Sequence, residues 1–170
     1  MKIFKPKMYK KSVFDINYDY LQKKNINVLI FDLDNTISLI NESIPNKKIE
    51  NLFKKLAKDF KIIIASNSSS RRVSKFSENL RCYGYGHMLK PSKRLYRKVL
   101  KKKNINLDEV CIIGDQLLTD ILLGNRLKIM TILVDPIGVK DLKVTYLNRK
   151  IEKILFKKMG IKRGMYSEEE

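Results

Sequence analysis

Two carboxylates stand two residues apart directly after an apolar run. Asp32 and Asp34 follow the residues from 27 to 31, a run that indicates a buried strand. If the extended geometry continues past this run, the two side chains point the same way. Because like charges held together resist ionisation, one carboxylate of such a pair would be hard to ionise without a compensating cation.

Polar groups also follow the other apolar runs of the chain. Ser66 and Asn67 come after the isoleucine-rich run at 62–65, and Asp115 comes after the run at 110–113 and Gly114. Ligands of open α/β sheets bind beyond the carboxyl ends of the strands. If the sheet is parallel, these groups meet at one edge, together with three more residues of the intervening loops: Asp34, Lys90 and Asp120.

The chemistry that these residue types suit is phosphoryl transfer. Mg²⁺ prefers oxygen ligands and commonly binds through one or two carboxylates and a phosphate, so Asp32, Asp34, Asp115 and Asp120 are its candidate ligands. Lys90 and the Ser66 hydroxyl can hold the remaining phosphate oxygens, and Asn67 lies beside them as a further candidate for substrate binding. A cation, a lysine and a carboxylate together favour transfer of a phosphoryl group to the carboxylate.

Apolar runs alternate with helical stripes along the chain. Strands are predicted at 27–31, 62–65, around 83–89, at 110–113 and at 129–134, and helices at 49–60, 73–80, 95–100 and 117–126, the last ending near Gly124. This alternation predicts βαβ units and an α/β fold, a three-layer α/β/α sandwich with a mostly parallel sheet. One domain over residues 1–165 is expected, with a disordered acidic tail at 166–170.

Two flanking segments complete the predicted domain. The N-terminal arm carries aromatic residues that are expected to pack on the domain edge. Near the C-terminus a helical stripe is predicted to face the core, made of Ile151, Ile154, Leu155 and Met159.

Composition narrows the classes of partner. The 36 Lys and Arg against 18 Asp and Glu give a net charge of +18, which favours anionic partners such as a phosphorylated metabolite, RNA or a lipid surface. A generally basic, solvated surface explains the same excess. Two cysteines, Cys82 and Cys111, form no metal-binding spacing, and no apolar stretch approaches the ~18 residues of a membrane span. A cytoplasmic location, with peripheral contact at the inner membrane face, is the expectation.

The same residues resemble the four motifs of the haloacid-dehalogenase-like (HAD) superfamily. The chain is further similar to its subfamily IIIA, the YqeG-like phosphatases, through nearly its whole length. The stretches that carry this resemblance are 12–16, 32–36, 114–120, 124–126, 131–134 and 148–152.

The resemblance implies a role for each motif residue. Asp32 would be the nucleophile that forms an aspartyl-phosphate, and Asp34 would protonate the leaving oxygen and then activate water. Ser66 and Lys90 would bind the phosphoryl group. Asp115 would hold Mg²⁺ with Asp32 and the backbone carbonyl of Asp34, and Asp120 would be an outer acidic member. An acid at the second position of the first motif is the phosphatase pattern of the superfamily.

Simpler interpretations exist for single residues. The serines from 66 to 70 suit a helix N-cap, Asp120 suits an exposed helix surface, and the lone His87 suits a structural role. The basic run from Lys93 to Lys103 is typical of a solvated helix face. The four motifs in order nevertheless favour an enzyme site.

Two hypotheses about the physiological role remain at this point. Related eukaryotic members of the family are phosphatidylglycerophosphate phosphatases, so the resemblance puts a phosphorylated lipid at an anionic membrane surface first. The second hypothesis is a basic RNA- or ribosome-associated module with secondary phosphatase activity. The intervals 36–62 and 66–90 are too short for a cap domain, because an independent domain needs ~40 residues or more. An open site is therefore expected.

Overall fold

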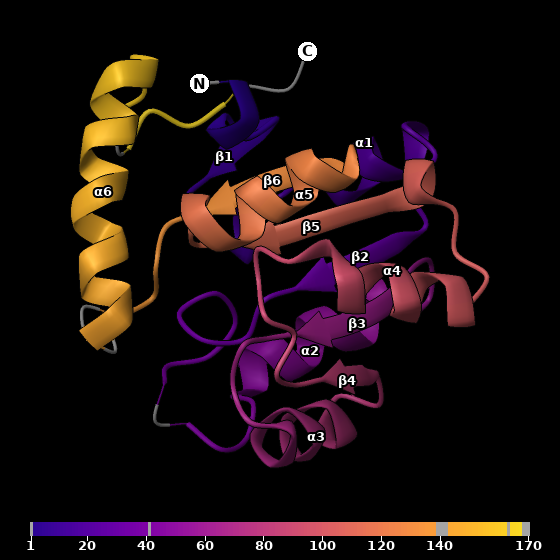
Figure 1. Cartoon of the computed structure of the whole chain (residues 1–170). Helices are drawn as coiled ribbons and strands as arrows, with labels where there is room; N and C mark the ends of the chain where they lie inside the picture. The colour runs from indigo at the N-terminus through magenta and orange to yellow at the C-terminus, as the bar shows by residue number, and fades with distance from the viewer. Residues whose placement is uncertain (1, 41, 139–142, 163, 168–170) are drawn as a thin grey trace.

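The chain folds around a six-stranded, wholly parallel sheet, as a computed structural model shows (Figure 1). The structure describes residues 2–40, 42–138, 143–162 and 164–167; of residues 143–147 only the backbone is described. The strand order is β1-β6-β5-β2-β3-β4. The strands are β1 (Met8–Lys10), β2 (Val28–Phe31), β3 (Lys61–Ala65), β4 (Tyr83–Tyr85), β5 (Val110–Gly114) and β6 (Met130–Val134).

Helices cover both faces of this sheet. They are α1 (Tyr18–Lys23), α2 (Lys47–Leu56), α3 (Ser70–Asn79), α4 (Lys93–Lys102), α5 (Leu122–Leu127) and α6 (Lys143–Met159). Short helical turns are η1 (Lys2–Phe4), η2 (Val13–Asp15), η3 (Leu107–Glu109) and the π-helical η4 (Leu117–Ile121). Asn46, Ser69 and Ser92 cap α2, α3 and α4 through their side chains, which satisfies backbone N–H groups that a helix start leaves open.

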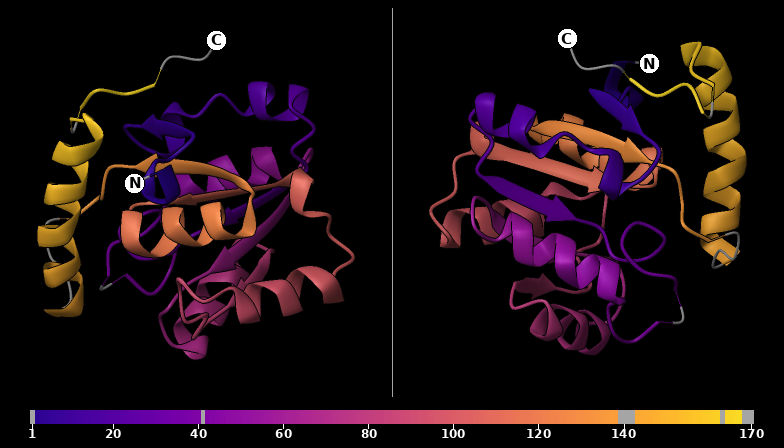
Figure 2. Two further views of the ribbon diagram at one scale, coloured as in Figure 1. Left: turned by 45° about the horizontal axis from the view of Figure 1, so that its top comes forward. Right: turned by 180° about the vertical axis from the view of Figure 1, so that it is seen from behind.

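Alternation along the central strands builds the two cores. Leu29 and Phe31 of β2 pack with α1, α2 and α3, whereas Val28 and Ile30 pack with α4 and α5. The two views of Figure 2 show these helix layers on opposite faces of the sheet. Near-continuous burial on both faces is what parallel strands require. The predicted three-layer α/β/α sandwich is thus confirmed.

The described residues contain no cap domain, as predicted. The chain between β2 and β3 forms only α2 and its loops, and the chain between β3 and α4 forms only α3 and β4. Helix α6 instead stands beside the carboxyl ends of the strands (Figure 1). None of the helices described is long and apolar enough to cross a bilayer.

The C-terminal helix buries a different face from the predicted stripe. Ile151 and Ile154 are 41% and 56% exposed, and the residues that face the domain are Glu152 and Phe156, which are 1% and 6% exposed. Leu155 and Met159 are only partly buried beside Phe156. The prediction failed because a hydrophobic stripe cannot register a buried acid.

Gly124 does not end a helix, contrary to the prediction. It lies inside α5, where a Cβ atom would come within 2.3 Å of Thr131 and 2.6 Å of Ile112. The helix ends at Leu127, and Lys128 follows with a φ of 62°. Gly124 therefore allows α5 to approach the sheet closely.

The N-terminal arm adds a strand that the sequence did not predict. Met8, Tyr9 and Lys10 pair in parallel with β6. The segment assigned to an acidic tail begins in contact with this strand, because the N–H of Ser167 donates to Tyr9 O at 2.8 Å and Tyr166 donates to Asp135 at 2.7 Å. Residues 168–170 lie outside the described residues.

Candidate active site

Neighbouring strands bring Asp32 and Asp115 together. β2 and β5 pair in parallel with Phe31 opposite Ile113, and the N–H of Asp32 continues the pairing by donating to Ile113 O at 2.9 Å. Asp32 is 5% exposed and Asp115 is 1% exposed. This position, where chain connections leave the central strands in opposite directions, is the topological switch point at which α/β sheets bind ligands.

A π-helical turn adds Asp120 to the same point. The turn η4 directly follows β5, and such turns occur frequently at functional sites. The Asp120 carboxyl group lies over Gly114, so that a Cβ atom there would fall 2.2 Å from its Cγ. Oxygen atoms of Asp32, Asp115 and Asp120 all lie within 4.8 Å of one another. Gly114 is therefore needed for Asp120 to reach the other two.

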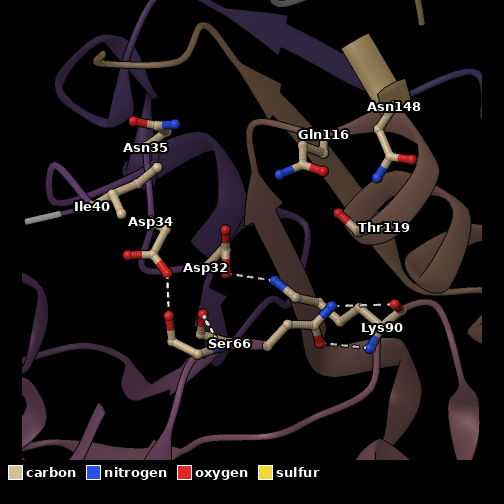
Figure 3. A pocket seen from close by; sticks show the side chains of 11 residues that line it. Asp32, Asp34, Asn35, Ile40, Ser66, Lys90, Gln116, Thr119 and Asn148 are labelled. Carbon is tan, nitrogen blue, oxygen red and sulfur yellow. Dashed lines mark hydrogen bonds and ion pairs between the residues drawn. The ribbon is translucent and has the colours of Figure 1, made fainter. Parts of the chain in front are cut away.

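Lys90 lies between two of these carboxylates. Its Nζ donates to Asp32 Oδ1 at 2.5 Å and to Asp120 Oδ1 at 2.7 Å, and the residue is 8% exposed (Figure 3). The side-chain amide of Asn67 fixes the backbone of Lys90, since Oδ1 accepts its N–H at 2.7 Å and Nδ2 donates to its carbonyl at 3.3 Å. Asn67, predicted to bind substrate, thus positions Lys90 as well as lining the pocket.

Asp34 lies on the other side of Asp32 from Lys90 (Figure 3). Its carboxylate accepts a hydrogen bond from the Ser68 hydroxyl and forms an ion pair with Arg72, whose Nη2 lies 2.6 Å from Oδ1. It does not join the cluster of three carboxylates, and a metal contact through Asp34 would fall to its backbone carbonyl. Arg72 also donates to the carbonyls of Leu39 and Glu42, so it ties the loop after β2 to the start of α3.

These groups open into one pocket of about 220 Å³. Ser66 lies at its wall, and its hydroxyl accepts the N–H of Ser68 at 3.2 Å. The lining residues are Asp32, Asp34, Asn35, Ile40, Ser66, Asn67, Ser68, Lys90, Gln116, Thr119 and Asn148. The volume is below the roughly 300 Å³ at which pockets begin to enclose a drug-sized ligand, so it suits a phosphoryl group whose carrier stays outside.

Helix α6 reaches the site through Arg149. One guanidinium nitrogen donates to the Asp115 carbonyl at 2.8 Å, and the other forms an ion pair with Asp115 Oδ2. The first nitrogen also donates to Glu152 at 3.1 Å. The sequence analysis assigned no role to Arg149 or Glu152, although both lie in the family-like stretch at 148–152.

Burial makes the carboxylates of this site hard to ionise. It raises the pKa of Asp115 to about 8 in spite of the opposing Arg149, and it raises the pKa of Asp32 to about 6 in spite of Lys90. Three acids face two cationic groups, Lys90 and Arg149, within this set of five side chains. An all-oxygen donor set with an excess of negative charge fits a divalent cation such as Mg²⁺.

The raised pKa values predict how stability depends on pH without a cation. A carboxyl whose folded pKa exceeds its unfolded value binds its proton more tightly when folded, so stability falls as pH rises through the folded pKa. Cation-free protein should lose up to about 1.4 kcal/mol per pH unit and per proton between pH 6 and 8.5. Its Tm should fall by several degrees in thermal denaturation across this range.

The control for this dependence is the Asp115→Asn variant, which should remove most of it. Added Mg²⁺ should also flatten it, because a bound divalent cation replaces the proton. A wild-type Tm that stays constant or rises between pH 6 and 8.5 without cation would contradict the assignment of these groups as buried and protonated.

Comparison with known proteins agrees with this site. Residues 87–144 match the family described as HAD-hydrolase-like. The chain is 33% identical over 153 residues to the probable phosphatase YqeG of Bacillus subtilis (strain 168), covering 89% of each chain.

Solved structures share the fold at low identity. The 3-deoxy-D-manno-octulosonate 8-phosphate phosphatase of Yersinia pestis matches with a TM-score of 0.52 and 17% identity, covering 71% of this chain and 79% of that chain. The cobalt-bound deoxy-D-mannose-octulosonate 8-phosphate phosphatase of Haemophilus influenzae matches with a TM-score of 0.50 and 14% identity, covering 81% and 91%.

The parallel sheet with acidic residues at its switch point therefore defines a HAD-like hydrolase. Within that class the chain belongs to the YqeG-like phosphatase family and is a phosphatase.

Proposed function

We propose that this phosphatase hydrolyses phosphomonoesters with Mg²⁺, through a phosphoryl group transferred to Asp32. The observation that carries the proposal is the placement of Asp32 at the pocket, 2.5 Å from the ammonium of Lys90 and beside two further buried carboxylates. A cation held by Asp32, Asp115 and the Asp34 carbonyl, with Asp120 behind them, would supply charge stabilisation to the phosphoryl oxygens.

The protein's own residues divide the reaction into two steps. In the first, an Asp32 oxygen bonds to phosphorus as the bond from phosphorus to the leaving oxygen breaks, and Asp34 gives that oxygen a proton. In the second, Asp34 takes a proton from water, whose oxygen bonds to phosphorus. The bond to Asp32 then breaks and releases inorganic phosphate. Lys90 and Ser66 hold the phosphoryl oxygens.

The substrate class follows from the open pocket and the family relationship. A pocket of about 220 Å³ can enclose a phosphoryl group but leaves the rest of the substrate outside. On α6, the exposed Ile151 and Ile154 lie among exposed lysines at 150, 153, 157 and 158. Apolar and basic side chains on one helix surface favour contact with an anionic membrane. Phosphatidylglycerophosphate presented at such a surface is therefore the proposed substrate.

Net charge is the single observation in favour of the second hypothesis, RNA or ribosome binding. The same charge accounts equally for attraction to an anionic lipid surface. We therefore propose no nucleic-acid function.

The substrate proposal predicts a large preference for a lipid in vesicles. With Mg²⁺, kcat/KM for phosphatidylglycerophosphate in vesicles should exceed that for glycerol phosphate by more than tenfold at low salt, and high salt should reduce the difference. Chelation of the cation should abolish phosphate release from both, and Ca²⁺ should restore it poorly because its looser geometry misplaces the attacking carboxylate.

A paired variant separates the surface from the site. Ile151→Asn with Ile154→Asn should lower kcat/KM on vesicles and leave the value for glycerol phosphate unchanged, since both side chains are exposed away from the pocket. Equal values for the two substrates in the wild-type enzyme would remove the membrane-surface proposal. Full activity after chelation would remove the proposed cation.

A further inference from the structure

Arg149 holds the proposed cation ligand Asp115 at two of its atoms. One guanidinium nitrogen donates to the backbone carbonyl of Asp115 at 2.8 Å and the other pairs with its Oδ2. The remaining carboxylate oxygen, Oδ1, accepts from the Thr36 hydroxyl at 3.2 Å. These three contacts fix the rotation of the Asp115 side chain, and a planar guanidinium is suited to such a two-point contact.

Glu152 holds Arg149 in turn and connects it to the backbone after β5. Its Oε2 accepts from Arg149 at 3.1 Å, and its Oε1 accepts the N–H groups of Leu117 at 2.5 Å and Leu118 at 3.4 Å. Glu152 is 1% exposed. Leu117 begins the π-helical turn η4 that carries Asp120, so the pair contacts the chain on both sides of the acidic cluster.

Helix α6 brings both residues to this point from outside the sheet. Its Phe156 packs against Tyr9, with ring centroids 6.0 Å apart, and belongs to a cluster with Leu117 and Ile121 of η4. Asn148, one residue before Arg149, lines the pocket. Figure 3 shows Asn148 on the same side of the pocket as Gln116 and Thr119. The helix is therefore docked on the turn that shapes the site.

We propose that Arg149 and Glu152 are positioning residues for the cation ligand Asp115, so that cation binding and the docking of α6 stabilise each other. The proposal rests on the proposed function, which places a divalent cation at Asp32, Asp115 and Asp120. Side chains that orient metal ligands affect metal affinity by about 10–100-fold when they are removed. Coupling between two such events is reciprocal, so the cation must also protect α6.

The competing account is that Arg149 only braces the helix or repels the cation. A brace would lower the Tm of the variant without changing the cation affinity of the folded protein. Repulsion between the guanidinium and the cation would make the affinity of the variant tighter. Cation affinity therefore separates the three accounts, because only positioning makes it weaker.

The test uses the full chain, Mg²⁺ alone and no substrate. Arg149→Met should weaken the Kd for Mg²⁺ about 10–100-fold in titration calorimetry, and Glu152→Gln should weaken it less. Lys153→Met removes an exposed cation from the same helix and should leave the Kd unchanged. In hydrogen exchange, Mg²⁺ should slow exchange of α6 amides in the wild type and not in Arg149→Met.

A Kd for Arg149→Met within twofold of wild type, or tighter, would overturn the proposal. Arg149→Lys provides a second test if Arg149→Met fails to fold, because it keeps the charge but cannot reach both atoms of Asp115. Its Kd should also weaken, and an unchanged Kd would again overturn the proposal. A wild type that binds no Mg²⁺ would instead overturn the proposed cation site, so the two failures are distinguishable.

Discussion

Replacing Asp32 by Asn is expected to reduce phosphate release to background while the protein stays folded. The amide has the shape of the carboxylate but lacks the charge that attacks phosphorus. Burial raises the pKa of Asp32 to about 6, so its ionised form is unfavourable in the cation-free protein at pH 7. The variant should therefore have a higher Tm than the wild type without cation, while circular dichroism stays unchanged.

The matched control is Asp59→Asn, the same chemical change at an exposed position outside the site. It should leave both phosphate release and Tm near wild-type values. Activity of Asp32→Asn within about threefold of wild type would contradict covalent catalysis by this residue, since loss of a nucleophile costs far more.

Replacing Asp34 by Asn is expected to lower turnover by about 10²–10⁴-fold, the usual contribution of a general acid and base. The loss should depend on the leaving group. An alkyl phosphate needs a proton on its leaving oxygen, whereas p-nitrophenyl phosphate does not, so the variant should still transfer the phosphoryl group from the second. It should then fail to activate water, and phosphorylated protein should accumulate in intact-protein mass spectra.

The leaving groups serve as the internal control for Asp34. An equal loss for both substrates, with no phosphorylated protein, would show that Asp34 acts in some other way. The ion pair with Arg72 holds the Asp34 carboxylate beside Asp32, so the wild-type geometry already favours one position for this proton donor.

The sheet and its carboxyl edge were predictable because their residues follow simple rules. Buried parallel strands are continuous apolar runs, as at 62–65 and 110–113, and the polar residues after them must meet at one edge. Asp32, Asp115 and Asp120 do converge there. The three-residue strand β1 escaped prediction because two flanking lysines and three residues give no period to detect.

The contacts between distant segments were not predictable from the same rules. Glu152 is buried because it accepts two backbone N–H groups of the turn after β5 and pairs with Arg149. A hydrophobic stripe therefore selected Ile151 and Ile154, which are exposed. Arg72 likewise resembles any basic residue near a helix start until the fold places it against Asp34.

The most direct test of the account is to find where the phosphoryl group goes during turnover. Enzyme mixed with phosphate-labelled substrate and quenched within milliseconds should carry label on one aspartate, and peptide mapping should place it on Asp32. Label at Asp32 that forms and decays at rates consistent with turnover is the predicted result. Label on another residue, or phosphate release at full rate with no labelled protein at any quench time, would contradict covalent catalysis at Asp32.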